Sequence, residues 1–375
     1  MNQHKVKILY VESTLESGGP TTQLFGIVRN LDRIKFEPII LTLSTEQINS
    51  SIKIFIENGI RVDSLNLSRA KFAVYGKYML KKKIQEYKPD IIHSSGLRAD
   101  GAINNLKLDY LHCMTIHNYV FDDYVSKFGA FVGKIASYYG LSAIKNCKYP
   151  ICCSKTLQKM YCNILNKKLY AVQNGVDIDK FKTTNNQDEK NRIRLELGIT
   201  DDRIVFLVVS TLIKRKDPLT IIRAFKEAKV DKEAVLIILG DGDLLNECKK
   251  ESYNNIIIKG KVNNVQDYLK ASDIYISASK SEGLPYSVIE AGSSGLNLVL
   301  SSIPQHIEIF EQNPMLVKSF EVGNIAKLAS IIKEIANKDI SLNNKKTIEH
   351  IRKNFSDKLM SKNYEKIYYR MIRNK

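Results

Sequence analysis

The sequence predicts an α/β protein with two doubly wound domains in tandem, facing each other across a cleft. Short β-rich apolar runs alternate with longer amphipathic segments along most of the chain, which is typical of βαβ units and a parallel sheet. A polar stretch at 183–191 interrupts this alternation and is the best candidate for a linker, and a second series follows it. The length of 375 residues and the hydrophobic content of 44% are sufficient for two buried cores.

The first predicted domain covers residues 1–182. Its strands are expected where short apolar runs end in turn residues, at Val6–Val11, Pro38–Leu43, Val62–Leu67, Asp90–Ser95, Cys113–His117, Ile151–Ser154 and Tyr170–Gln173. Amphipathic helices are predicted between them at Thr21–Leu31, Ser51–Asn58, Val74–Tyr87 and Lys127–Lys145.

The second predicted domain covers residues 183–352, and a terminal helix within 353–375 is expected to pack back toward the first domain. Strands are predicted at Ile204–Val209, Ala234–Leu239, Asn255–Lys259, Ile274–Ser277 and Asn297–Ser301. Helices are predicted at Pro218–Lys229, Val265–Ala271, Ser287–Ser293 and Asn354–Arg373. Because Asp217 directly precedes Pro218, we expect its carboxylate to cap the free amides of that helix.

Composition excludes several classes of protein. No run approaches the roughly 18 apolar residues of a membrane span, and Val6 begins a strand without the apolar core of a signal peptide before it. The six cysteines show no metal-ligand spacing, and the adjacent pair Cys152 and Cys153 lies in an apolar run. We therefore expect a protein of the reducing cytoplasm.

The charge is strongly basic and uneven. The net charge is +17, and residues 61–170 carry 18 basic against 7 acidic side chains. Such an excess attracts nucleic acid, an anionic bilayer or a phosphorylated substrate, or it is only a solvated lysine-rich surface. Segment 71–83 has five lysines beside aromatic and apolar residues. This pattern is typical of a helix that lies on a membrane surface, and equally of an ordinary amphipathic helix with a solvated basic face. No nucleic-acid-binding motif is present, so we expect no nucleic-acid partner.

The strongest local signal is the segment SEGLPYSVIEAG, which directly follows the strand predicted at Ile274–Ser277. Ligands of open α/β sheets bind at the carboxyl ends of strands. Gly283 permits close approach of the backbone, and Pro285 marks the start of a helix whose free amides can receive a phosphate. Glu282 and Glu290 add two carboxylates that accept hydrogen bonds from hydroxyl groups. The pattern suits a nucleotide sugar, or else it is a polar loop with a helix-dipole glutamate.

Other signals are weaker. Three cations, Lys214, Arg215 and Lys216, follow the strand at Ile204–Val209. Cations at this place can stabilise a leaving diphosphate, or they can form a solvated basic turn without a function. Gly18 and Gly19 follow the first strand, where main chain can approach a ligand. The strand-end residues His117 and His93 are more often structural than catalytic.

Taken together and in this order, these segments resemble the retaining glycosyltransferases of family 4, which have the GT-B fold of two Rossmann-like domains. The resemblance covers nearly the whole chain, and the spacing of Glu282 and Glu290 is its most specific feature. The other segments that carry it are Gly18–Gly19, Thr115–Asn118, Cys153–Lys155, Gln173–Asp177 with Phe181, Lys216–Asp217, Ile238–Gly242, Gly260 and Ala271–Asp273.

The resemblance implies a donor site in the second domain. Glu282 would bind the donor hexose hydroxyls, and the backbone of Gly283 and Leu284 would lie near the sugar and the phosphate. Glu290 would hold the ribose hydroxyls. Lys216 and the helix amides after the proline would neutralise the departing diphosphate.

In the first domain, the resemblance places His117 by the transferred sugar and Gly18 with Gly19 along the crevice between donor and acceptor. Enzymes of this type need no bound metal or other cofactor, since the nucleotide sugar is a co-substrate, and no Asp-x-Asp motif stands in a suitable place here. Two departures concern the donor site. Thr211 stands where the family usually has an arginine, a charge that Arg215 or Lys214 could supply. Residues 305–306 are Gln-His where a glycine pair is usual.

The sequence therefore predicts a retaining, metal-independent transferase that moves a hexose or N-acetylhexosamine, most readily from a UDP-sugar. Its acceptor would be a glycan or lipid-linked molecule of bacterial surface polysaccharide synthesis. We expect the enzyme in the cytoplasm, bound peripherally to the inner face of the plasma membrane. A non-catalytic GT-B partner that stabilises another transferase is the alternative that Thr211 keeps open. A hydrolysing sugar-nucleotide epimerase shares the fold, but the paired glutamates favour the transferase.

Overall fold

The computed structural model describes the chain except for residues 1–4, 107–108, 200–202, 338–343 and 375. The chain divides into two compact units, residues 1–175 with 357–375 and residues 176–356. It passes between the units at these points, whereas the sequence placed the boundaries at 182 and 352. The difference arises because the Val176 amide donates to the Phe355 carbonyl at 2.8 Å and Val176 forms a bridge with Ser356, which joins both segments to the second unit.

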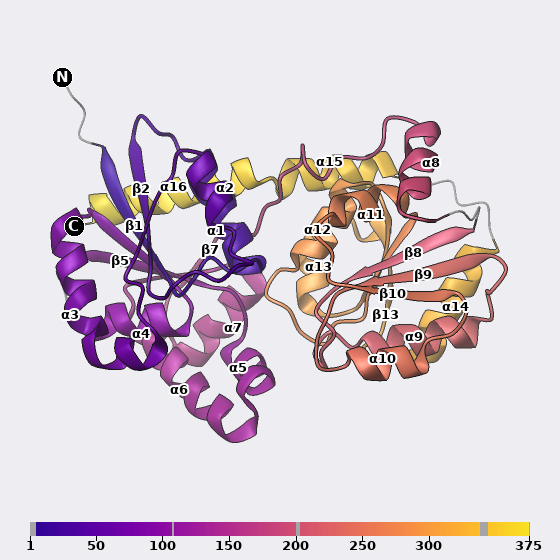
Figure 1. The fold of residues 1–375 in the computed structure, drawn as a ribbon, viewed down its shortest axis with the longest axis horizontal. Helices are drawn as coiled ribbons and strands as arrows, with labels where there is room; N and C mark the ends of the chain where they lie inside the picture. The colour runs from indigo at the N-terminus through magenta and orange to yellow at the C-terminus, as the bar shows by residue number, and fades with distance from the viewer. Residues whose placement is uncertain (1–4, 107–108, 200–202, 338–343, 375) are drawn as a thin grey trace. The chain divides into compact units, whose positions relative to one another are not determined.

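The first unit is built on a parallel sheet with the strand order β3-β2-β1-β4-β5-β6-β7 (Figure 1). Its strands are β1 (Val6–Glu12), β2 (Phe36–Thr42), β3 (Arg61–Ser64), β4 (Ile91–Ser95), β5 (Leu111–Ile116), β6 (Tyr149–Cys152) and β7 (Tyr170–Ala171). Its helices are α1 (Gly19–Asn30), α2 (Ile52–Glu57), α3 (Arg69–Tyr87), α4 (Leu97–Leu106), α5 (Val120–Phe128), α6 (Ala130–Asn146), α7 (Lys155–Leu165) and α16 (Asp357–Arg373).

Helices cover both faces of this sheet because alternate residues of each strand point to opposite sides. Ile8 and Tyr10 of β1 pack with α1, α2 and α16 in one buried cluster. Leu9 and Val11 pack with α3 and α4 in another. The predicted terminal helix corresponds to α16, which packs on α1.

The second unit has a parallel sheet with the order β10-β9-β8-β11-β12-β13. Its strands are β8 (Ile204–Val209), β9 (Ala234–Leu239), β10 (Ile256–Gly260), β11 (Ile274–Ser277), β12 (Asn297–Ser301) and β13 (Val317–Phe320). Its helices are α8 (Gln187–Glu196), α9 (Pro218–Ala228), α10 (Leu245–Glu251), α11 (Val265–Ala271), α12 (Tyr286–Ser293), α13 (Pro304–Phe310), α14 (Ile325–Ala336) and α15 (Asn344–Asn354), with a short 3₁₀ turn at Pro314–Leu316. Phe206 and Val208 of β8 pack with α9, α10 and α14 in its main core.

Two local predictions, one of a linker and one of a helix, were wrong in detail. The predicted linker at 183–191 contains the start of α8, because the Asn186 side chain accepts a hydrogen bond from the Glu189 amide at 2.9 Å and caps the helix. Arg194 of this helix then pairs with Asp273 at 2.7 Å. The single helix predicted at Lys127–Lys145 is instead the pair α5 and α6, which breaks at Gly129.

Gly240 fixes the turn after β9, and its replacement by alanine is expected to lower the free energy of unfolding by about 3 kcal/mol or more. Its φ is +143°, and a Cβ there would lie 1.8 Å from the carbonyl oxygen of Ser210, which follows β8. Gly260→Ala is the matched control, because Gly260 also has a positive φ (+73°) but open space around its Cβ position. It should cost only about 1–2 kcal/mol. Urea unfolding of both variants measures the difference, and equal losses would contradict the steric argument.

Candidate functional site

The loops at the centre of the second sheet form one candidate site. The strand order reverses direction at β8 and β11, which are neighbours although β9 and β10 come between them in the sequence. Loops that leave such a switch point diverge, and ligands of open α/β sheets bind there. The loop after β8 carries Lys214, Arg215 and Lys216, and the loop after β11 carries Glu282.

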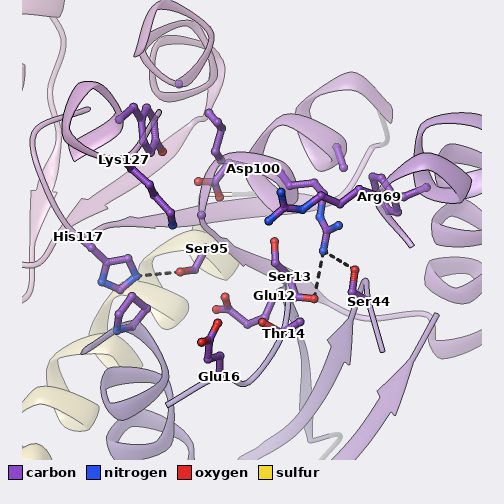
Figure 2. Close-up of a pocket in the computed structure, with 18 of the residues that line it drawn as sticks. Glu12, Ser13, Thr14, Glu16, Ser44, Arg69, Ser95, Asp100, His117 and Lys127 are labelled. Carbon is purple, nitrogen blue, oxygen red and sulfur yellow. Dashed lines mark hydrogen bonds between the residues drawn. The ribbon is translucent and has the colours of Figure 1, made fainter. Parts of the chain in front are cut away.

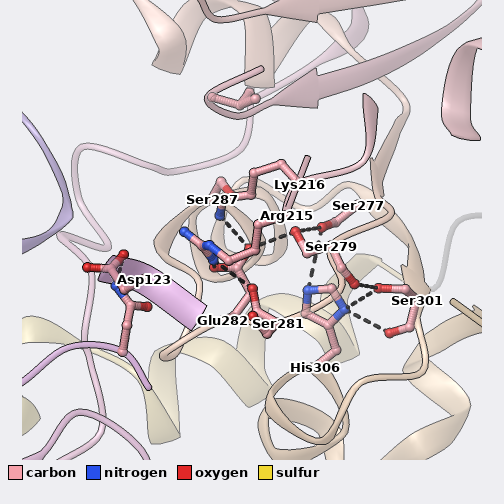
Figure 3. Close-up of polar contacts among 12 residues, drawn as sticks. Asp123, Arg215, Lys216, Ser277, Ser279, Ser281, Glu282, Ser287, Ser301 and His306 are labelled. Carbon is pink, nitrogen blue, oxygen red and sulfur yellow. Dashed lines mark hydrogen bonds and ion pairs between the residues drawn. The ribbon is translucent and has the colours of Figure 1, made fainter. Parts of the chain in front are cut away.

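An ion-pair network joins these two loops (Figure 3). Arg215 Nη1 lies 3.1 Å from Glu282 Oε2 and donates to the Ser281 carbonyl at 2.6 Å. Lys216 Nζ pairs with Glu282 Oε1. Ser279 donates to the same carboxylate oxygen at 2.7 Å. Two cations therefore surround one carboxylate, and this part of the site carries an excess of positive charge.

The charge of Glu282 is held in place by these neighbours. Its side chain is only 6% exposed, and burial alone raises the pKa of a carboxylate. The nearby charges of Lys216 and Arg215, with the hydrogen bonds from Lys216 and Ser279, outweigh that effect and lower the pKa of Glu282 to about 2. The carboxylate is thus ionised at neutral pH and able to accept hydrogen bonds.

The helix α12 begins directly after this loop. Pro285 precedes its first residue in an extended conformation and provides no side-chain cap. Such a helix start favours an anion. Glu290 lies further along the helix, and burial raises its pKa to about 7, although the charge of Lys180 opposes this. Gly283 and Leu284 are buried in the loop that connects β11 to α12.

The residues flagged in the loop after β8 have different environments. Thr211 and Lys214 are exposed, whereas Arg215 is part of the ion-pair network. The predicted cap of α9 was wrong: the Asp217 carboxylate accepts from the Thr220 hydroxyl at 2.8 Å and pairs with Lys280 at 3.2 Å, and makes no capping bond to a backbone amide. Asp217 has a φ of +50°, in the left-handed region, whereas a capping residue is usually extended.

His306 belongs to the Gln-His pair at the position where the family usually has two glycines. It supports the ion-pair network through neighbouring serine residues. Its Nδ1 donates to the Ser301 carbonyl at 2.8 Å, and its Nε2 lies 3.5 Å from the Ser277 hydroxyl. Ser277 is 3.2 Å from Ser279, which binds Glu282. Burial lowers the pKa of His306 to about 4, so the ring is neutral at physiological pH.

A separate candidate site is a cavity of about 1320 Å³ within the first unit (Figure 2). Gly18 and His117 line it, while Gly19 is the first residue of α1. A hydrogen bond of 2.8 Å joins His117 Nε2 to the Ser95 hydroxyl, and burial lowers the pKa of His117 to about 4. His93, by contrast, is buried between Thr115 and Tyr368 of α16 and is structural.

Glu12 and Asp100 are among the carboxylates that line the same cavity, and the sequence analysis did not single them out. Glu12 ends β1 and Asp100 lies in α4 after β4, and these two strands are neighbours at the switch point of the first sheet. Burial and the charge of Asp100 raise the pKa of Glu12 well above its usual range. Burial also raises the pKa of Asp100 to about 7, although it accepts a hydrogen bond from Ser94 at 2.6 Å.

Two negative findings apply to the described part of the chain. No group of three or more His, Cys, Asp or Glu side chains in it could hold a metal ion. None of the helices described has both the length and the apolar character that crossing a membrane requires.

Comparison with known protein families gives two matches. Residues 17–180 match the family described as Glycosyltransferase Family 4, and residues 189–354 match Glycosyl transferases group 1. The two matches together span nearly all of both units. The chain belongs to the family 4 glycosyltransferases.

Individual relatives align with most of the chain. The chain is 25% identical to the O-antigen biosynthesis glycosyltransferase WclY of Escherichia coli over 98% of this chain and 99% of that protein. It is 27% identical to an E. coli UDP-Gal:alpha-D-GlcNAc-diphosphoundecaprenol alpha-1,3-galactosyltransferase, over 75% and 73%. Among solved structures, HepE from Anabaena in complex with UDP and glucose has a TM-score of 0.82 at 16% identity over 97% and 99% of the chains. This likeness, together with the two family matches, confirms the GT-B fold predicted from the sequence.

Proposed function

We propose that this glycosyltransferase transfers a hexose or N-acetylhexosamine from a UDP-sugar, with retention of configuration, to a glycan or lipid-linked acceptor in bacterial surface polysaccharide synthesis. Two relatives support the pathway and the donor class: one is named for O-antigen biosynthesis, and the other for a UDP-galactose donor and a diphosphoundecaprenol-linked acceptor. The HepE structure, which contains UDP, supports the same class of donor.

The observation that carries the proposal is the network of Arg215, Lys216 and Glu282 at the switch point of the second sheet. As the sugar–phosphate bond breaks, negative charge develops on the diphosphate, and fixed cations stabilise that charge more in the transition state than in the ground state. Lys216 and Arg215 supply these cations without a metal ion. Glu282 holds both cations in position and accepts hydrogen bonds from the donor hexose hydroxyls.

The first turn of α12 binds the phosphates through its backbone amides, and Glu290 accepts hydrogen bonds from the ribose hydroxyls. This chain has Thr211 at the position where the family usually has an arginine, and Arg215 supplies the missing positive charge. It already lies in the network, whereas Lys214 is exposed.

The acceptor binds in the cavity of the first unit, where Glu12, Asp100 and His117 present polar groups to its hydroxyls. In the transfer step, the bond between the sugar carbon and the phosphate oxygen breaks, and the acceptor oxygen bonds to that carbon on the same face. The acceptor hydroxyl passes its proton to the departing phosphate oxygen, so the products are the glycoside and UDP.

The enzyme works in the cytoplasm, on the inner face of the plasma membrane, to which its basic surface at 61–170 attracts it.

A thermal-shift screen against UDP, GDP and their common sugar conjugates, with and without magnesium, tests the donor class. A ligand that binds only the folded protein stabilises it by about 4 kcal/mol at one thousand times its Kd. We expect UDP and one UDP-sugar to raise the Tm equally with and without magnesium, and the guanosine nucleotides to leave it unchanged.

The same screen separates the proposal from its alternative. If no nucleotide changes the Tm, the chain is a non-catalytic GT-B partner, and the exposed Thr211 is the first position to examine. If the Tm rises with UDP-sugar but the only product is free sugar or an epimer, the transferase proposal is wrong while the donor site stands. The configuration of the product, read by NMR at the anomeric carbon, tests retention.

A further inference from the structure

Helix α6 is oriented with its small side chains toward the protein and its large apolar side chains toward solvent. Its buried face consists of Gly133, Ser137, Gly140, Ala143 and Ile144. On its outer face, Phe131 is 79% exposed, Ile135 58% and Tyr138 66%. An ordinary surface helix has the opposite arrangement. The outer face of α6 therefore offers apolar surface that no other described part of the chain covers.

The close packing of α6 on α5 fixes this orientation. A Cβ at Gly133 would lie 2.4 Å from Val125 Cα and 2.6 Å from the Tyr124 carbonyl oxygen, so only glycine permits this contact. The helices lie side by side (Figure 1), and the Ser137 hydroxyl donates to the Val120 carbonyl at 2.9 Å. Rotating α6 to bury its aromatic side chains would break these contacts. The exposed apolar face is thus built into the fold.

The charges on α6 and on the segments that directly follow it are all positive, whereas Asp122 and Asp123 lie at the start of α5. No Asp or Glu occurs between Asp123 and Asp177, and this interval contains eight lysines. Lys127 at the end of α5 and Lys134 on α6 are both exposed beside the apolar residues. Lysines next to outward-facing aromatic and aliphatic side chains complement an anionic bilayer, where the charges meet headgroups and the apolar side chains enter the acyl boundary.

The apolar face continues into the cavity of the first unit. Phe128 of α5 and Tyr139 of α6 line that cavity and are also exposed at its rim. On another side, α3 contributes Phe72 and Lys77 to the lining. The outer surface of α3 exposes further apolar residues and lysines, namely Val74, Tyr75, Tyr78, Lys71, Lys81 and Lys82. The opening of the cavity is therefore bordered by residues of the kind that bind membranes.

We infer that α6 inserts its Phe131, Val132, Ile135 and Tyr138 face into an anionic membrane, with Lys127 and Lys134 on the headgroups. This opens the cavity toward the bilayer, from which the glycan end of a lipid-linked acceptor enters. The inference rests on the proposed function for the identity of that acceptor. The sequence pointed only to the segment 71–83; the structure adds α6 as the inserting element.

The chain contains no tryptophan, so Phe131→Trp introduces a single fluorescent reporter into the full-length protein. With vesicles of equal parts phosphatidylglycerol and phosphatidylcholine, its emission should shift to shorter wavelength and be quenched by brominated lipid. Ile34→Trp is the matched control, since Ile34 is 74% exposed in the same unit but outside α3, α5 and α6. Its emission should not change. The assay contains no donor sugar, so its result is independent of the transfer reaction.

Co-sedimentation measures the contribution of each group. Phe131→Gln with Ile135→Gln should weaken vesicle binding by about tenfold for each side chain. Lys127→Gln with Lys134→Gln should weaken it by about fivefold for each charge at low salt. Wild-type binding by the apolar double variant, or an unshifted Phe131→Trp emission on bound vesicles, would overturn the inference. So would a dimer in solution that the apolar double variant converts to monomer, because that assigns the face to a second copy.

Discussion

Replacing Lys216 with alanine is expected to lower kcat for sugar transfer by about 10²–10³-fold, the usual effect of removing one group that stabilises developing charge. Lys216 and Arg215 share Glu282, so the variant keeps one cation and the hydrogen bond from Ser279. The loop after β11 should therefore stay in place. Steady-state release of UDP, with the donor that the thermal-shift screen identifies, measures the effect.

Lys214→Ala is the matched control for this prediction. Lys214 precedes the network by one residue and has the same charge, but its side chain is exposed. It should retain nearly full kcat, and Lys216→Arg should retain more activity than the alanine variant because it keeps the charge. Equal kcat values for the Lys216 and Lys214 alanine variants would show that the location of the positive charge has no effect. That result would contradict the proposed role of Lys216 in stabilising the leaving group.

The sequence predicted the sheets well because their strands are buried on both faces. The apolar runs at 204–209, 234–239, 274–277 and 297–301 are bounded by polar or turn residues, and the structure has strands with these same limits. Local patterns were less informative where a tertiary contact decides the outcome. The polar segment at 183–191 looked like a linker, yet Asn186 caps a helix that Arg194 fastens to Asp273.

The donor side of the site was also predictable in part. The residues of one loop, such as Glu282 and Gly283, are close in sequence, and the cations of the other loop, Lys216 among them, directly follow a predicted strand. The pairing of Arg215 with Glu282 depends on how the loops after β8 and β11 meet, which no local pattern records. Glu12 and Asp100 were missed for the same reason, since 87 residues separate them and only the adjacency of β1 and β4 brings them to one cavity.

The environment of Glu290 leads to a second large effect, on both stability and UDP binding. Burial raises its pKa from 4.5 to about 7, so between these pH values the folded protein binds more protons than the unfolded chain. The free energy of unfolding should therefore be unaffected by this group below pH 4.5 and fall as the pH rises toward 7. A shift of this size corresponds to about 3 kcal/mol at most. Glu290→Gln should remove this loss, so the variant matches wild type near pH 4 and is the more stable protein near pH 8.

The affinity for UDP should rise with pH over the range in which the free energy of unfolding falls. If the ribose hydroxyls donate to Glu290, the ionised carboxylate is the form that binds, and the affinity of wild type should rise with pH up to about 7. Glu290→Gln should lose this dependence and bind UDP about 10–100-fold more weakly near pH 8, the value of hydrogen bonds to a charged group. The titration of the UDP phosphate itself is common to both proteins and cancels in their ratio. Calorimetry across this pH range measures it, with the exposed Glu247→Gln as the control.

The combination of the two results identifies the role of the residue. A glutamate that is only part of the helix packing would change the stability profile of the Glu290→Gln variant and leave the ratio of UDP affinities constant with pH. A glutamate that binds the ribose would change both, with opposite signs. A partly buried carboxylate that destabilises the free protein at neutral pH is a reasonable feature only where a ligand restores its hydrogen bonds. A more stable variant with an unchanged affinity for UDP would therefore remove Glu290 from the donor site and leave Glu282 as its only carboxylate among the residues we assign to it.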